Sequence, residues 1–286
     1  MTLSFVDTHV HFWDKDRIPY PWLAEVPDIA DPHTPADLLA DAGRQPPRRI
    51  VFVEAGAHPL RGLDEVRWIE DLAVRHARQL VIGAIVAFTA VDRDVETDVA
   101  LDALRARPLV RGVRHLIQGE TDPRFCLRPE FVAGVQSVGA RGLSFDLCVR
   151  PPQLPAVVEL VRLCPETSFI LDHAGKPDVR GGVLDPWRAH IAELARLPNV
   201  VCKLSGLVTE ADPAAWTPAQ LRPYVDHLLA TFGARRLLFG SDWPVVKQAA
   251  TYQRWLETAL SLIETLVPAY REAIMSDNAR RVYRLS

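Results

Sequence analysis

Two histidines stand two residues apart near the N-terminus, directly after a short apolar run. The run from Leu3 to Thr8 is followed by His9, Val10 and His11. Alternate side chains of an extended segment share one face, so we expect the two imidazoles to point the same way. Such a pair at a strand end can hold a metal ion or polarise a carbonyl group, whereas a lone histidine would more often be an ordinary polar residue.

Two later apolar runs also end in residues that can do chemistry. Ser168–Leu171 leads directly into Asp172 and His173, and the run from Arg236 to Gly240 is followed by Ser241 and Asp242. A carboxylate in such a place can act as a general base or as a metal ligand. The alternatives are a hydrogen-bonded core histidine and a turn aspartate. The predicted catalytic and metal-ligating residues are His9, His11, His173 and Asp242.

Further polar and aromatic residues near the ends of other runs are weaker candidates. An arginine beside a binding site can clamp a carboxylate or a carbonyl group, and a charge inside an apolar strand is costly unless it is used. Tryptophan can support the apolar face of a sugar, although each tryptophan could equally be structural. The predicted substrate-binding residues are Arg114, His115, Gln118, Trp13, Asp146, Lys203 and Trp243, with Trp22 as a further aromatic candidate.

Eight short apolar runs, most of them about 30 to 40 residues apart, alternate with helical patterns. Such near-continuous apolar strands are typical of a parallel sheet. We therefore predict one (β/α)8 barrel of the TIM type spanning residues 1–286 as a single domain, with an open doubly wound sheet as the alternative. The predicted strands are Leu3–Thr8, Ile50–Glu54, Leu80–Val86, Val110–Leu116, Leu143–Val149, Ser168–Asp172, Val200–Leu204 and Arg236–Gly240.

The barrel prediction also fixes where the chemistry should lie, because catalytic residues of such barrels sit at the C-terminal ends of the strands. The aromatic, proline-rich segment from Phe12 to Pro35 follows the first strand, and we expect it to form a lid over the barrel mouth. Asp185 and Thr217 are predicted helix N-caps, each followed by a proline. Other predicted helices run over Asp64–Arg78, Arg93–Arg105, Leu154–Leu163, Thr251–Leu266 and Pro268–Tyr283.

Composition excludes several classes of function. The 33 basic and 36 acidic residues nearly balance, so there is no excess of positive charge that would indicate binding to nucleic acid or to an anionic membrane. The longest mostly apolar run, Leu80–Val91, is too short to cross a bilayer, and no signal peptide is recognisable, so a cytoplasmic protein is expected. The four cysteines form no CxxC pair and are predicted to be reduced core residues. No dinucleotide or Walker motif is present, so no organic cofactor is expected.

The motifs together resemble the amidohydrolase superfamily, and within it the amidohydrolase-2 type. The resemblance is carried by the H-x-H pair after the first strand, LDHAGKP after the sixth, and GSDWP after the eighth. VRGVRHLIQ, KLSG and the terminal DNARRVYRL agree with it, so it spans essentially the whole chain. The nearest group resembles sugar-lactone hydrolases acting on L-fuconolactone or L-rhamnonolactone, with 2-pyrone-4,6-dicarboxylate lactonases as more distant relatives.

This resemblance implies a role for each residue that matches a family motif. His9, His11 and His173 would bind a metal or polarise the substrate carbonyl, and Asp242 would deprotonate the attacking water. The fourth strand carries Arg114 and His115 in place of the lysine that bridges two metals in binuclear members, so one zinc-like divalent ion, or none, is expected.

The predicted function is hydrolysis of a small sugar lactone by a monomer or homodimer, with no nucleic-acid or membrane partner. A metal-dependent decarboxylase on the same scaffold is the first alternative. A non-catalytic sugar-binding barrel is an alternative from another class.

Overall fold

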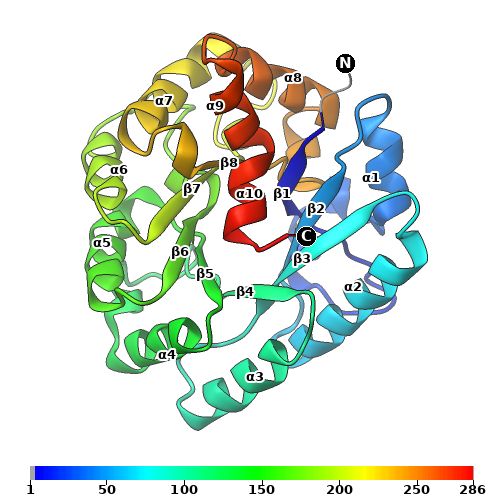
Figure 1. Ribbon diagram of the computed structural model, residues 1–286, viewed down its shortest axis with the longest axis vertical. Helices are drawn as coiled ribbons and strands as arrows, with labels where there is room; N and C mark the ends of the chain where they lie inside the picture. The colour runs from blue at the N-terminus through cyan, green and yellow to red at the C-terminus, as the bar shows by residue number, and fades with distance from the viewer. Residues whose placement is uncertain (1–3, 286) are drawn as a thin grey trace.

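Eight parallel strands, hydrogen-bonded in chain order, form the centre of the fold (Figure 1). The computed structural model describes residues 4–285, so Leu3, the predicted start of the first strand, lies outside the described residues. The order and the parallel pairing confirm the predicted barrel. The strands are β1 Val6–Val10, β2 Arg49–Val53, β3 Val81–Phe88, β4 Val110–Arg114, β5 Ser144–Leu147, β6 Ser168–Leu171, β7 Val200–Leu204 and β8 Leu237–Phe239.

The ring closes between β1 and the segment just after β8. Val10 and Trp243 form an isolated parallel bridge. The Asp242 amide donates to the His9 carbonyl across 2.9 Å, and the His11 amide donates to the Trp243 carbonyl across 2.8 Å. The peptide groups of three predicted catalytic residues therefore take part in closing the barrel.

Helices surround the strand ring, as the βα alternation predicts (Figure 1). Pro186, rather than the predicted Asp185, is the N-cap of α6, and the Asp185 carboxylate pairs with Arg188 instead of capping the helix. The predicted last helix is divided by a π-helical turn over Ala273–Asp277. The α-helices are α1 Pro35–Ala42, α2 Gly62–His76, α3 Val95–Arg105, α4 Pro129–Ala140, α5 Leu154–Leu163, α6 Trp187–Ala195, α7 Pro218–Thr231, α8 Tyr252–Leu262, α9 Pro268–Glu272 and α10 Asn278–Val282.

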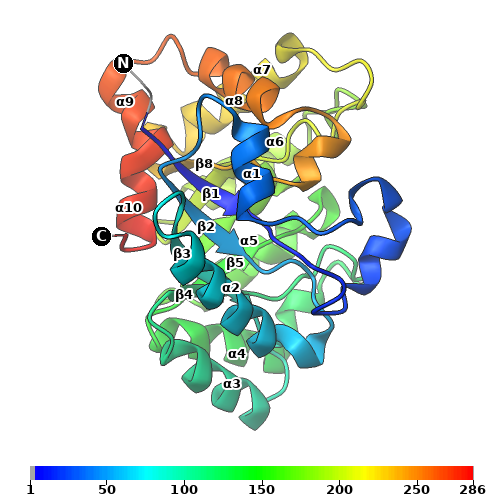
Figure 2. The same cartoon turned by 90° about the vertical axis from the view of Figure 1, so that its right-hand side faces the viewer.

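The two ends of the barrel differ. At the end where the strands begin, Tyr283 and Ala279 of the C-terminal helical segment pack against strand side chains such as Val51 and Leu238. The segment from Phe12 to Pro35 lies at the opposite end (Figure 2). Its aromatic residues are mostly buried, so it forms a packed rim at the mouth of the barrel. Within the described residues, every helix is too short or too polar to cross a membrane.

Candidate active site

A cavity of about 470 Å³ opens at the C-terminal ends of the strands. Trp22 and Phe88 provide apolar walls, while Gln118 and Lys176 add polar groups. His11, Arg114, His173 and Asp242 also line it. Its place in the barrel is where active sites of this fold lie.

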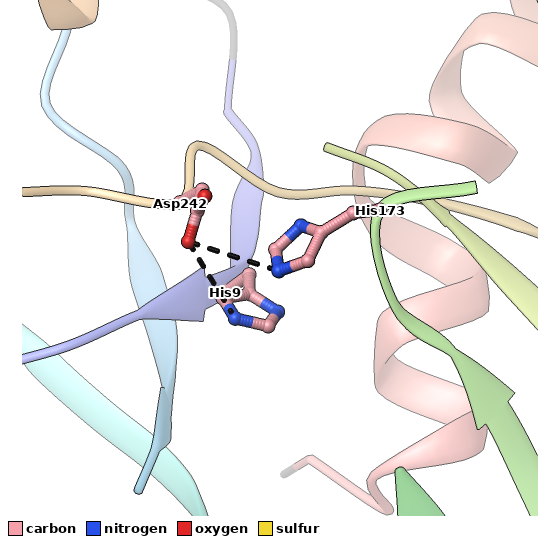
Figure 3. Close-up of side chains that lie close together, drawn as sticks. All are labelled: His9, His173 and Asp242. Carbon is pink, nitrogen blue, oxygen red and sulfur yellow. Dashed lines mark ion pairs between the residues drawn. The ribbon is translucent and has the colours of Figure 1, made fainter. Parts of the chain in front are cut away.

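The structure brings the four predicted catalytic side chains together, and Figure 3 draws three of them, His9, His173 and Asp242. Asp242 Oδ1 lies 3.4 Å from His11 Nε2, 3.7 Å from His9 Nε2 and 3.9 Å from His173 Nε2. His9 of β1 and His11, which follows that strand, face each other with their Nε2 atoms 3.1 Å apart. One carboxylate is thus surrounded by three imidazoles, two from the end of β1 and one from the segment after β6.

Two of these four residues have a left-handed backbone conformation, which non-glycine residues adopt uncommonly. The φ angle is 52° at His173 and 61° at Asp242. Such conformations cost about 1–3 kcal/mol each and persist only where the surroundings impose them. Both side chains point toward His9 (Figure 3).

Two glycines make room for the histidines. A Cβ on Gly206 would lie 2.5 Å from His173 Nδ1, and a Cβ on Gly240 would lie 2.8 Å from the Cβ of His9. Ser205, next to Gly206, hydrogen-bonds His173 Nδ1 at 2.9 Å. These contacts give the KLSG and GSDWP motifs a physical role, because both hold histidines in place.

A buried cation lies beneath His9. The Lys203 Nζ is 2.6 Å from Asp146 Oδ2, 2.8 Å from Asp172 Oδ1 and 3.1 Å from His9 Nδ1. Burial would lower the pKa of Lys203, but Asp146 and Asp172 raise it above its ordinary value, so the side chain is an ammonium. Lys203 and Asp146, which the sequence suggested as substrate ligands, therefore lie behind His9 and outside the cavity lining.

Arg114 lines the cavity, but its guanidinium is already hydrogen-bonded to carboxylates of the protein. Its Nε donates to Glu54 Oε1 across 2.6 Å, and its Nη1 donates to Asp172 Oδ2 across 3.1 Å. Sequence reasoning assigned no role to Glu54 or Asp172, although both stand at ends of predicted strands. The criterion that identified the histidines, a position at the end of a predicted strand, would have identified these two carboxylates as well.

Three other candidates lie outside the cavity lining. His115 packs among Phe88, Phe125 and Phe131, because it points away from the barrel axis while its neighbour Arg114 points inward. The Trp13 indole donates to backbone carbonyls of the rim, and the Trp243 indole donates to Asp41 Oδ2. Both indoles are fully buried, so they support the rim.

Burial sets the charge states of the site. It lowers the pKa of His173 to about 4, and, together with Lys203, it lowers the pKa of His9 well below the ordinary value. Burial alone would raise the pKa of Asp242, but the imidazoles of His173 and His11 hold that pKa below its ordinary value. At neutral pH an ionised carboxylate therefore faces His9 and His173 as neutral imidazoles.

His9, His173 and Asp242 are spaced for a metal ion, since one ligand atom from each lies within 4.8 Å of the others. A metal-binding histidine normally donates its second ring N–H to a carboxylate or a carbonyl. His11 meets this rule, because its Nδ1 faces the Val53 carbonyl at 2.8 Å. For His9 the nearer partner of Nδ1 is the Lys203 ammonium at 3.1 Å, which can only donate, while the Asp172 carboxylate lies at 3.4 Å. The spacing of the cluster fits a metal, but the hydrogen bonding of His9 does not.

Comparison with known proteins agrees with the fold. The chain is 36% identical to an L-fucono-1,5-lactonase of Burkholderia multivorans, over 98% of this chain and 96% of that protein. It is 33% identical to an L-fucono-1,5-lactonase of Burkholderia ambifaria, over 98% and 95%. A crystal structure of an amidohydrolase from Burkholderia multivorans with bound zinc superposes with a TM-score of 0.87 at 34% identity, covering 99% of this chain and all of that one.

A family model completes the comparison. The amidohydrolase model Amidohydro_2 matches residues 6–285, which include all eight strands and every residue of the cluster around Asp242. The chain therefore belongs to the amidohydrolase family that this model describes.

Proposed function

We propose that this protein hydrolyses a sugar-derived lactone, such as L-fuconolactone, to the free hydroxy acid. The observation that carries the proposal is the ionised Asp242 carboxylate held within 4 Å of three imidazoles at the floor of the cavity. The L-fucono-1,5-lactonases that resemble the chain over nearly its whole length support the same substrate class.

The arrangement supplies both parts of a lactone hydrolysis. Asp242 accepts a proton from water as the water oxygen attacks the lactone carbonyl carbon. Imidazole N–H groups stabilise the negative charge that develops on the carbonyl oxygen. When the tetrahedral intermediate collapses, the ring C–O bond breaks, and Asp242 returns the proton to the departing ring oxygen. One lactone and one water thus give one hydroxy acid, and the carboxylate is regenerated.

Charge pairing around the cavity favours a neutral lactone. Arg114 is paired with Glu54 and Asp172, and Lys176 lies 3.6 Å from Glu210. The alternative function, decarboxylation, would need an unpaired cation to bind the carboxylate of the substrate. Arg114 is not available for this role, because both Glu54 and Asp172 already pair with it. A polyhydroxylated ring could instead rest on Trp22 and bond to Gln118.

Two finer points belong to the proposal. Zinc is dispensable for turnover, which the Lys203 contact at His9 supports. The enzyme acts in the cytoplasm on a free small molecule, as a monomer or homodimer. Support for the compartment comes from the four cysteines, which are buried and unbridged.

A pH-indicator screen of neutral aldonolactones, with and without a chelator, tests the reaction and the metal requirement together. We expect acid release that survives chelation. Asp242→Asn should lower kcat roughly 10²- to 10⁴-fold, the usual contribution of a general base. Asp226→Asn, an exposed change on α7, is the matched control and should keep wild-type turnover. Acid release from none of the lactones, or full activity in Asp242→Asn, would refute the proposal.

A further inference from the structure

The side chain of His9 lies among charged and polar groups, of which Lys203 and His11 are the nearest, at 3.1 Å each. We propose that Lys203 is a positioning residue that holds neutral His9 with its proton on Nε2, so that His9 meets the substrate carbonyl as a hydrogen-bond donor and is a poor metal ligand. This role deepens the proposed lactone hydrolysis and rests on it.

The first support is the geometry of the ammonium. Lys203 and His9 are both fully buried, so no solvent competes for their contacts. An ammonium can only donate, and the Lys203 Nζ lies 3.1 Å from His9 Nδ1. Nδ1 must then present a lone pair. A neutral imidazole that accepts at Nδ1 carries its proton on Nε2, the nitrogen nearest Asp242 and His11.

The second support comes from the other side of the ring. A backbone carbonyl can only accept, so the 2.8 Å contact between His11 Nδ1 and the Val53 carbonyl places a proton on that nitrogen. In the neutral form of His11 the lone pair is then on Nε2, which lies 3.1 Å from His9 Nε2. A proton on His9 Nε2 completes this contact, whereas a bare Nε2 would set two lone pairs against each other.

The opposite tautomer makes only longer contacts. With its proton on Nδ1, His9 would face Asp172 Oδ1 at 3.4 Å and would accept from Arg114 Nη1 at 3.5 Å. It would give up both 3.1 Å contacts, those to Lys203 and to His11. Arg114 Nη1 already donates to Asp172 Oδ2 across 3.1 Å, so it does not depend on His9. The balance of contacts favours the proton on Nε2.

The proposal can be tested on the wild-type protein by NMR. Long-range ¹H–¹⁵N correlation spectra of the metal-free enzyme, labelled with ¹⁵N in its histidines, distinguish a protonated ring nitrogen from an unprotonated one. The signals of His9 are assigned by their loss in the His9→Gln variant. We expect His9 Nε2 to be protonated and Nδ1 bare. A His9 ring protonated on Nδ1, with Nε2 bare, overturns the proposal. The measurement needs neither turnover nor an altered buried cluster.

A pair of variants tests whether Lys203 is the cause. Lys203→Met with Asp146→Asn removes one buried positive and one buried negative charge together. Asp172 then becomes the acceptor nearest to Nδ1, so we expect the His9 proton to move there and zinc affinity, measured by calorimetry with zinc alone, to rise about 10-fold or more. Metal-free kcat should fall roughly 10²-fold or more, with KM little changed. Asp146→Asn alone keeps Lys203 and should keep the wild-type tautomer and zinc affinity.

An unchanged tautomer and zinc affinity in a folded double variant would overturn the role of Lys203, as would the same shifts in the single variant. If the double variant does not fold, the wild-type spectrum still decides. A failed lactone screen would count against the proposed function alone, because the tautomer and zinc measurements do not depend on turnover.

Discussion

Glu54 holds the guanidinium of Arg114 with both its side chain and its backbone. The Arg114 Nε donates to Glu54 Oε1 across 2.6 Å, and Nη2 donates to the Glu54 carbonyl across 2.7 Å. Both side chains are almost completely buried. The orientation of Arg114 is therefore fixed before any substrate enters, and its charge is balanced within the protein.

Replacing Glu54 by Gln should destabilise the fold strongly, because the variant leaves a buried cation with less compensation. We expect the free energy of unfolding to fall by roughly 2–4 kcal/mol, near the lower part of the range for broken buried pairs, since Asp172 still contacts Arg114. Urea denaturation measures this change. Glu159→Gln, which breaks the exposed pair with Arg124, is the control and should cost less than about 1 kcal/mol. Equal losses in both variants would contradict the argument.

Gly206→Ala should damage catalysis beyond its effect on stability. The new Cβ would collide with His173 Nδ1, and a displacement of about 1 Å at a reacting group can cost 10²-fold in rate. Gly142→Ala is a matched control: its φ is 68°, against 64° at Gly206, but its Cβ would meet nothing within 4 Å. We expect both variants to lose stability in urea, and only Gly206→Ala to lose kcat. Normal turnover in folded Gly206→Ala would show that His173 tolerates displacement.

Stability should depend on pH through Glu65, a buried carboxyl on α2. Burial, with a contribution from Glu54, raises its pKa from 4.5 to about 8. The folded state then binds a proton more tightly than the unfolded state, so this stabilisation is complete below about pH 4.5 and is lost as the pH rises through 8. Relative to Glu65→Gln, the wild type should lose on the order of a few kcal/mol between about pH 5 and pH 8. Parallel pH profiles of the two proteins in urea would contradict the shift.

Replacing Glu210 should change the preference of the enzyme between charged and neutral substrates. This residue is the carboxylate partner of Lys176, whose side chain lines the cavity. Glu210→Gln leaves an uncompensated ammonium there, so we expect KM for a carboxylate-bearing lactone to fall about 10-fold, equivalent to about 1.4 kcal/mol. KM for a neutral aldonolactone should change little. Steady-state kinetics on both lactones measure the ratio, and an unchanged ratio would place Lys176 away from the bound ring.

The fold and the convergence of the four predicted catalytic residues were predictable for one reason. Each of those residues lies within three residues of the end of an apolar run, and the C-terminal ends of parallel strands in a barrel meet at one mouth. The position of a residue along its strand therefore carried the information. Glu54 and Asp172 follow the same rule, so the sequence contained the signal for them too.

Other details depend on packing that no local pattern contains. Arg114 and His115 are neighbours, and the sequence does not say which of the two points into the barrel. The tryptophans of the rim could each have met a sugar, but buried Trp13 and Trp243 satisfy their N–H groups with backbone carbonyls and with Asp41. The left-handed backbone at His173 is likewise set by its surroundings, among them Gly206.

The bridge between Val10 and Trp243 couples closure of the strand ring to assembly of the cluster around Asp242. The amides of His11 and Asp242 are among the last rungs of the strand ring, and their side chains line the cavity. If β1 and the segment after β8 separated, Asp242 would lose its contacts with His9 and His11. We therefore expect partial opening at this seam to abolish activity while most of the helices remain folded.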